Sequence, residues 1–424
     1  MHADPDSAGS PAAAPGGRGR DIRICALIGT GHFLSHFYML CLPPLFLSWR
    51  DEFGVSYAAL GLAVALMSGT TALLQTPVGF WVDRRGARPF LIGGTLLMAL
   101  SVAAMGLAPA FWMVLALAVL SGVGNSVIHP ADYAILAGSI DKGFMGRAFA
   151  LHTFTGNLGF ALAPPTIALL LAFMDWRAAL LLVGLLGVPV VGAILLQSRV
   201  LQDQPKPKRR EDGAATGRAL LLSRPMLLFF AFFLLSSMAG SGVQAWLVTV
   251  LGKLWGTPVL VASSALTGYM VGATGGTLVG GWLADRARRD RLFGAVVLLT
   301  LGAMALLLLP GLVNLPDALL SAVAVLAGLA LGTSRTPRDV MLRDASPPGE
   351  VGKVFGFVSA GLPLGSAITP VPLGLLIDLG YPHLVLPVVA GLLGLSLLCA
   401  GGAEGGARAG RRARKAAAVA APAE

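Results

Sequence analysis

Residues 79–93 read GFWVDRRGARPFLIG, and residues 281–294 read GWLADRARRDRLFG. Each stretch follows one long apolar run and precedes another. Each contains a Gly, an Asp four residues later and then a cluster of Arg. The distance between the two copies is close to half of the 424-residue chain. A charged loop that recurs in this way indicates a protein that crosses a membrane many times and consists of two related halves.

The composition agrees with a membrane protein. Hydrophobic residues make up 55% of the chain and charged residues only 12%, whereas an ordinary soluble domain is about 25% charged. The three cysteines, Cys25, Cys41 and Cys399, all fall in apolar runs. They predict neither a disulfide framework nor a metal site.

The distribution of basic residues predicts the topology. Twelve apolar runs reach the length of about 20 residues that a membrane-spanning helix needs. If the N-terminus is cytoplasmic, all but three of the 31 Lys and Arg residues fall on the cytoplasmic side, the exceptions being Arg50, Arg177 and Lys253. Cytoplasmic loops are enriched in Lys and Arg. The net charge of +10 is therefore a topology signal with no nucleic-acid partner, and both termini are expected in the cytoplasm, with the chain in a bacterial inner membrane.

The expected domains follow from the charged segments. They are a disordered N-terminus (1–22), an N-terminal six-helix bundle (23–198), a cytoplasmic linker (199–224), a C-terminal six-helix bundle (225–401) and a disordered tail (402–424).

The repeat extends beyond the charged loop. Residues 129–136 read HPADYAIL and residues 336–342 read TPRDVML, so that Pro and Asp recur at one common spacing. The spans themselves are interrupted by prolines, which favour kinks, at Pro130, Pro164, Pro337 and Pro370.

Twelve spans in a 6+6 arrangement, a charged central linker and G-x-x-x-D-R in both loops resemble the major facilitator superfamily of secondary transporters. The HPADYAIL block and the stretch GNLGFALAP (156–164) resemble the fosmidomycin-resistance-like branch. The resemblance implies an all-α membrane protein with two pseudo-symmetric six-helix bundles around a central cavity. The loops depart from the family pattern at Ala87, where Arg is usual, and at Arg288, where Gly is usual.

The charged loops are expected to act as a gate on the cytoplasmic side. Gly79 would let its span approach a neighbour closely, and the resemblance places Asp83 beside the N-terminus of span 11, where an anion is favoured. Arg84 or Arg88 would pair with Asp132 when that side is closed. The alternative is that these charges only fix the topology. The gating candidates are Gly79, Asp83, Arg84, Gly86, Arg88, Asp132, Gly281, Asp285, Arg286, Arg289, Arg338 and Asp339.

Four histidines lie inside the expected spans, about 10–18 Å from their cytoplasmic ends at 1.5 Å rise per residue. They are His32, His36, His129 and His152. Because buried polar groups in a membrane mark functional sites and His titrates near pH 6.5, they are candidates for a proton relay, with Asp132 next. Substrate contact without coupling and simple hydrogen bonding between helices remain alternatives. An HxxxH pattern without a nearby carboxylate does not predict a metal site.

The second half offers fewer polar groups. Gln244 and Tyr269 are expected to line the cavity. Arg335 would bind an anionic group through its fork of donors, or else extend to the cytoplasmic interface as Arg338 does.

We therefore expect a proton-coupled secondary transporter that exports a small organic solute as an antiporter, by alternating access. It is not an enzyme, it needs no cofactor or metal, and it acts as a monomer in a lipid bilayer. Uptake of a small organic anion is one alternative. The other is a membrane receptor or scaffold that keeps the fold without transport.

Overall fold

The computed structural model describes residues 18–140, 144–201, 220–288, 291–346 and 351–420, and they are mostly helical. Twelve helical stretches in this part of the chain are long and apolar enough to cross a membrane. The predicted all-α fold with twelve spans is confirmed.

The N-terminal bundle provides the first six spans. Three of these are single helices, and the other three are made of shorter helices placed end to end. The elements are α1 (Arg18–Leu40), η1 (Pro43–Leu45), α2 (Phe46–Phe53), α3 (Tyr57–Arg85), α4 (Arg88–Met105), α5 (Phe111–Ser126), α6 (Ile128–Ser139), α7 (Met145–Leu171), α8 (Trp176–Leu185), α9 (Gly187–Gln197) and η2 (Ser198–Val200).

The C-terminal bundle provides the other six spans, of which the eleventh is divided into three short helices. The elements are α11 (Arg224–Trp255), α12 (Val259–Arg286), α13 (Leu292–Leu312), α14 (Asp317–Ala345), α15 (Val351–Ser359), α16 (Gly361–Ile368), α17 (Pro370–Asp378), η4 (Pro382–Leu384) and α18 (Val385–Ala420).

Two of the four prolines mark breaks in the helices. Pro130 lies in the first turn of α6, and Pro370 begins α17. Pro164 and Pro337 lie inside the continuous helices α7 and α14, so the predicted break is absent there. A proline removes one backbone hydrogen bond, and packing against neighbouring helices in a membrane bundle lets the helix continue past it.

The ends of the chain differ from the expected disorder. Helix α1 already begins at Arg18, and α18 continues to Ala420, because the Ala- and Arg-rich sequence beyond residue 402 favours helix. Residues 1–17, 421–424 and the linker segment 202–219 lie outside the described residues. The domain boundaries therefore stay a prediction.

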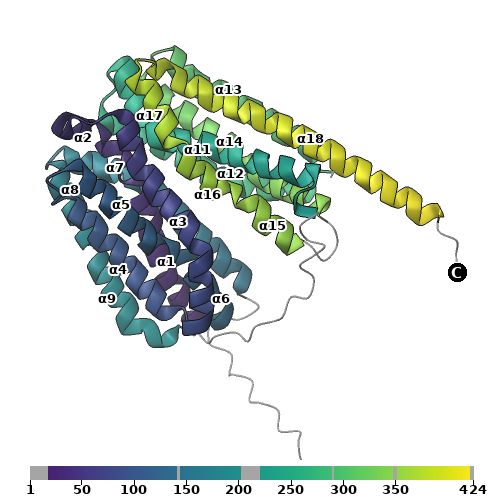
Figure 1. The fold of residues 1–424 in the computed structure, drawn as a ribbon, viewed down its shortest axis with the longest axis horizontal. Coiled ribbons are helices and arrows are strands. Elements are labelled where there is room, and N and C mark those ends of the chain that lie inside the picture. The colour runs from purple at the N-terminus through teal and green to yellow at the C-terminus, as the bar shows by residue number, and fades with distance from the viewer. Residues whose placement is uncertain (1–17, 141–143, 202–219, 289–290, 347–350, 421–424) are drawn as a thin grey trace, which may run out of the picture.

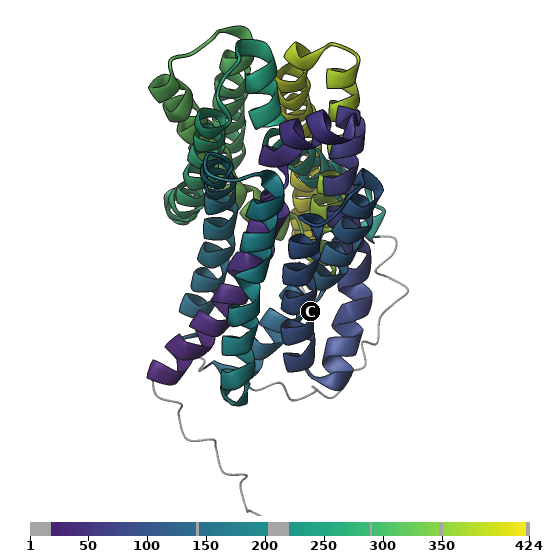
Figure 2. The same cartoon turned by 90° about the vertical axis from the view of Figure 1, so that its left-hand side faces the viewer.

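The two bundles meet at one end of the molecule. We call the end that carries Arg18 and the α3–α4 loop the terminal face, and the end that carries α2 and the end of α17 the far face. Figure 1 shows the bundles side by side near the far face and diverging toward the terminal face. Figure 2 shows that the helix axes of both bundles lie roughly along the line between the terminal face and the far face.

A carboxylate joins the halves at the far face. Asp378, the last residue of α17, accepts hydrogen bonds from the backbone N–H groups of Tyr57 and Ala58 at the start of α3, at 2.7 and 2.8 Å. Arg50 lies 3.6 Å from the same carboxylate. The first N–H groups of a helix have no partner within the helix, so a side chain of the C-terminal half satisfies donors of the N-terminal half.

Candidate functional site

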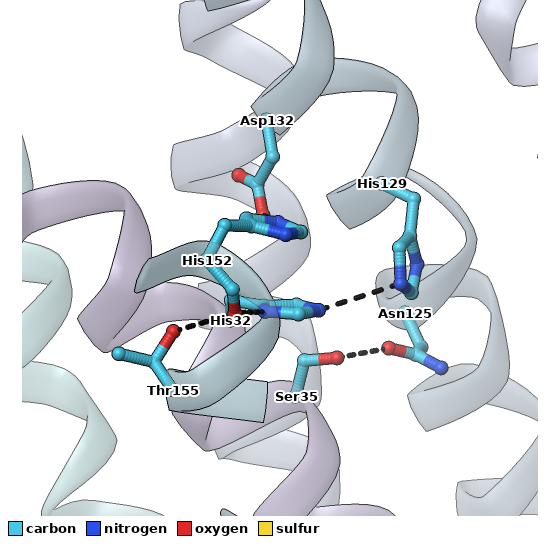
Figure 3. A network of polar contacts seen from close by, with 7 residues as sticks. All are labelled: His32, Ser35, Asn125, His129, Asp132, His152 and Thr155. Atoms are coloured by element: carbon cyan, nitrogen blue, oxygen red, sulfur yellow. Dashed lines mark hydrogen bonds and ion pairs between the residues drawn. The ribbon is translucent and has the colours of Figure 1, made fainter. Parts of the chain in front are cut away.

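The four predicted histidines converge inside the N-terminal bundle. His32 and His36 come from α1, His129 from α6 and His152 from α7. Figure 3 shows His32, His129 and His152. Residues four apart share one face of a helix, and α1 presents this face where α6 and α7 meet it. The ring centroids of His36 and His129 lie 4.4 and 5.1 Å from that of His32. The four histidines that were predicted to lie at a similar depth therefore form one cluster.

His32 is the centre of this cluster. Its ring stacks on that of His152 with a centroid distance of 3.7 Å and an interplanar angle of 11°. Its Nδ1 lies 2.8 Å from the backbone carbonyl of His152, and its Nε2 lies 3.4 Å from Nε2 of His129. Because a carbonyl only accepts hydrogen bonds, Nδ1 of His32 is the donor in the first contact.

A buried ion pair or hydrogen bond lies beside the stack. Asp132 of α6 is fully buried, and its Oδ2 lies 3.0 Å from Nε2 of His152, which is itself 3% exposed. The pairing of Asp132 with Arg84 or Arg88 was predicted for a form closed at the terminal face. In this form, where the bundles diverge at that face, Asp132 contacts His152, so that pairing stays a prediction.

A series of side-chain hydrogen bonds lies next to the cluster, and sequence reasoning did not predict it. Ser35 donates to Oδ1 of Asn125 at 2.6 Å (Figure 3). The amide of Asn125 in turn donates to Thr71 at 3.2 Å. A lone Asn in the apolar run of span 4 was the available signal, because an amide is costly in a bilayer unless it is satisfied.

Gly156 makes the room for the cluster. A Cβ at this position of α7 would lie 2.5 Å from Cε1 of His32 and 2.9 Å from Cε1 of His36. Any larger residue would displace both imidazoles from α7. The stretch GNLGF is therefore tied to the histidines of α1 by packing.

The same residues meet the minimum geometry of a metal site. Ligand nitrogens of His32, His36 and His129 all lie within 4.8 Å of one another. The HxxxH pattern without a nearby carboxylate did not predict a metal site here; the third nitrogen comes from His129 of α6.

The C-terminal bundle contains a cavity of about 280 Å³. All three residues predicted for the substrate pathway of this half, Gln244, Tyr269 and Arg335, line it. Arg338, which was predicted as a gating residue, lines it as well. Five serines and one threonine that sequence reasoning did not select complete the polar lining: Ser236, Ser237, Ser241, Ser334, Ser366 and Thr300.

The two arginines of this cavity differ. Arg338 has a partner, because its guanidinium lies 3.0 Å from the carboxylate of Asp339 and 3.9 Å above the ring of Phe233. Arg335 forms no ion pair with any residue that the structure describes, and no Asp or Glu is among the described residues that line the cavity. Its charge is therefore available to a bound anion.

The charged loops are separate from both polar centres. Gly86 ends α3 with φ of 86°, a conformation that favours glycine, and its N–H bonds to the carbonyl of Val82. A Cβ on Gly79 or Gly281 would meet nothing within 4 Å, so the predicted close approach at Gly79 is absent while the bundles diverge at this face.

The arginines of these loops have different environments. Arg286 lies over the ring of Trp282 at 4.6 Å, Arg84 is exposed and Arg88 is half-buried. The side chains of Asp83 and Asp285, and the whole of Arg289, lie outside the described part of the chain. Gating by these loops stays a prediction.

Twelve spans in two bundles, with polar groups buried inside each, define a membrane transporter fold. The sequence model of the Major Facilitator Superfamily matches residues 28–316 and 237–418. The chain belongs to this superfamily, whose members are transporters and not enzymes.

Individual relatives are distant but cover most of the chain. The Fosmidomycin resistance protein of Escherichia coli strain K12 is 25% identical over 88% of this chain and 91% of its own length. The Membrane sensor protein UhpC of the same organism is 23% identical over 81% of this chain and 84% of its own length. A solved bacterial homologue of the human lysosomal transporter Spinster, in an inward-facing and unoccupied conformation, superposes with a TM-score of 0.74 over 93% of this chain and 98% of its own, at 14% identity.

Proposed function

We propose that this protein is a proton-coupled antiporter that exports a small organic solute by alternating access. The Asp132–His152 pair carries the proposal, because it is a fully buried carboxylate bonded to an imidazole inside a membrane span. Ionisable groups at such depth mark ion or substrate pathways. The protein acts as a monomer in the bacterial inner membrane, with the terminal face in the cytoplasm.

Asp132 is the proton carrier in this proposal, and His152 is its partner. A carboxylate in an apolar interior is tolerated either when it is paired with a cation or when it is neutral. Oδ2 of Asp132 contacts His152, while its Oδ1 has no hydrogen-bond partner among the described residues. The pair therefore has forms that differ by one proton, and a conformational change that alters access to Oδ1 would load or release it.

The cavity of the C-terminal bundle supplies the substrate site. Arg335 offers a planar fork of donors that suits a carboxylate, a phosphate or a phosphonate. The surrounding hydroxyls, together with Gln244 and Tyr269, provide further hydrogen bonds. A small solute with an acidic group matches these residues.

Alternating access accounts for the different spacing of the two bundles at the two faces of the molecule. The bundles are joined at the far face by Asp378 and diverge at the terminal face. With the terminal face in the cytoplasm, this form receives solute from the cytoplasm. Opening of the far face would then release it, in exchange for a proton.

Export is favoured over uptake because one relative is named for resistance, and a transporter confers resistance most simply by removing a compound. Uptake of an organic anion is the alternative direction on the same site. A receptor without transport is the alternative class, and the similarity to a protein named as a membrane sensor supports it.

The test begins with growth on fosmidomycin and on a panel of toxic organic acids, comparing an expressing strain with an empty-vector strain. Proteoliposomes with an imposed pH gradient then measure proton-driven movement of any compound that the screen identifies. Asp132→Asn should abolish proton-driven transport but keep exchange of labelled for unlabelled substrate, because only the proton site is lost.

The matched control is Asp317→Asn, which removes an exposed carboxylate in the first turn of α14 and should behave as wild type. Full proton-driven transport by Asp132→Asn would disprove the coupling. Failure to move any compound on the panel, with binding retained, would favour the receptor.

A further inference from the structure

We propose that His32, His36 and His129 form a binding site for Zn²⁺ inside the N-terminal bundle, and that the bound metal arrests transport. The first part stands on the geometry of the three histidines alone. The second part rests on the proposed function, because it requires Asp132 to carry the coupled proton.

The spacing of the histidine nitrogens fits a tetrahedral ion. Zinc binds imidazole nitrogen at about 2.0–2.1 Å, so two nitrogens at adjacent corners of the tetrahedron lie about 3.3–3.4 Å apart. Nε2 of His32 and Nε2 of His129 are 3.4 Å apart. A ligand nitrogen of His36 lies within 4.8 Å of both, so a change of its side-chain torsions by a modest amount would close the third corner.

The hydrogen bonds of His32 orient it as a metal ligand. Its Nδ1 donates to the backbone carbonyl of His152 at 2.8 Å, which leaves a lone pair on Nε2 when the ring is neutral. Ligand histidines typically donate their other N–H to a carbonyl or a carboxylate in this way. Thr155 also donates to that carbonyl, at 2.9 Å, and holds the acceptor in place.

The contact between His32 and His129 leaves an unsatisfied nitrogen without a metal. Two lone pairs cannot face each other at 3.4 Å, so His129 must present Nε2–H to His32 when both rings are neutral. Its Nδ1 is then a bare acceptor, and this buried atom has no hydrogen-bond partner among the described residues. A cation bound by Nε2 of both rings would replace the hydrogen bond between them, with the proton of His129 then on Nδ1.

The donor set selects the class of metal. Three imidazoles without a carboxylate ligand suit Zn²⁺, Cu²⁺ or Ni²⁺ and do not suit Mg²⁺ or Ca²⁺, which prefer oxygen. Three protein ligands leave the fourth zinc position open for water. The side chains of His36 and His129 are half-buried, whereas that of His32 is buried.

The neighbouring Asp132–His152 pair is separate from this site. Nε2 of His152 is already engaged by Asp132 at 3.0 Å, and this carboxylate is not one of the three ligands. His32 stacks on the ring of His152 at 3.7 Å, so an ion that fixes His32 would also restrict the movement of the partner of Asp132. Bound zinc would therefore prevent the change in access to Asp132 and stop the coupled cycle.

Binding is measured on the full chain, purified without a polyhistidine tag and held in lipid nanodiscs, by competition with a chromophoric zinc indicator. The expected result is one Zn²⁺ per chain. His129→Gln should weaken binding by at least about 100-fold, since loss of a ligand exceeds the 10–100-fold effect of losing a supporting group. His383→Gln, which changes a histidine of η4 outside the cluster, is the matched control and should bind as wild type.

Cobalt provides a second measurement that does not depend on any variant. Tetrahedral Co²⁺ absorbs visible light much more strongly than octahedral Co²⁺, so wild type with Co²⁺ should show intense visible bands that Zn²⁺ removes. Wild-type binding no tighter than that of His129→Gln, or a cobalt spectrum of the octahedral type, would overturn the metal site.

Transport in proteoliposomes separates the two parts of the proposal. Zn²⁺ should inhibit wild type at the concentration that fills the site, while His129→Gln should be insensitive relative to its own zinc-free rate. Zinc that binds without inhibiting would leave the site standing and overturn the arrest of the proton carrier. Absence of binding with proton-driven transport intact would overturn the site and leave the proposed function in place.

Discussion

The two bundles have the same six-span architecture but differ in how their buried polar side chains are packed. In the N-terminal bundle, His152 contacts both His32 and Asp132, and all three side chains are almost fully buried. In the C-terminal bundle, Arg335 and a set of hydroxyls surround a cavity of about 280 Å³. A packed network is suited to holding protons, whereas an open cavity with an unpaired charge is suited to holding a solute. In the proposed function, the N-terminal half therefore carries the coupling and the C-terminal half binds the substrate.

The largest expected effect that tests this division is at Arg335. Arg335→Gln removes a charged donor from the cavity, and a hydrogen bond to a charged group contributes about 1.5–3 kcal/mol. Binding of the transported acid should weaken by about 10- to 150-fold, measured by the concentration dependence of exchange in proteoliposomes. Arg343→Gln, at an exposed position of the same helix, should leave binding unchanged. Equal effects of both variants would contradict a substrate site in the C-terminal half.

The packing of the N-terminal network is tested at Gly156. Gly156→Ala places a Cβ against the rings of His32 and His36, and overpacking typically costs about 1–3 kcal/mol. The thermal unfolding midpoint in detergent should fall by several degrees. Gly192→Ala in α9, where a Cβ meets nothing within 4 Å, should leave the midpoint unchanged or raise it. If Gly156→Ala keeps the unfolding midpoint and the proton-driven transport of wild type, the network tolerates displacement of the two histidine rings.

The connection between the halves is tested at Asp378. Asp378→Asn weakens an acceptor of the first N–H groups of α3, and loss of such a cap costs about 0.5–2 kcal/mol. Hydrogen exchange in the first turn of α3 should accelerate by about 2- to 30-fold as the far face opens more often. Asp51→Asn, an exposed carboxylate at the same face, is the control. Unchanged exchange in Asp378→Asn would mean that other contacts keep this face closed.

The smallest expected effect is at the charged loop. Asp83→Asn removes an anion that the family resemblance places near a helix N-terminus, an interaction of about 0.3–1 kcal/mol. Accessibility of an engineered cysteine at the terminal face should increase by about 2- to 5-fold, and transport should slow accordingly. If accessibility and transport both match wild type, the loop fixes topology and does not gate.

The sequence was sufficient for the fold and for the location of the polar centres. Apolar runs of spanning length and the repeated loop predicted twelve spans in two halves, because a bilayer allows few alternatives to helices. The depth of His32, His36, His129 and His152 along their spans correctly placed them in one layer. Depth along a helix follows from residue number alone, since the rise per residue is fixed.

The partners of these residues were not predictable in the same way. Rotation of each helix about its axis depends on packing, and this rotation brings Asp132 to His152. The third nitrogen beside His32 and His36 likewise comes from another helix, at a separation of more than ninety residues. The serines of the C-terminal cavity gave no sequence signal because Ser is common in membrane helices. Ser237 and Ser241 donate to backbone carbonyls of α16, a pairing between helices that residue order does not reveal.

The bond between Asp378 and the start of α3 has a consequence for the energetics of the cycle. Its two donors are backbone amides, so they persist whatever side chains occupy positions 57 and 58. When the halves separate at the far face, only water can replace the carboxylate. In the proposed cycle, each turnover therefore includes a hydration step at one helix end. Excluded osmolytes that oppose exposure of the protein surface should lengthen the time spent in the form with a closed far face.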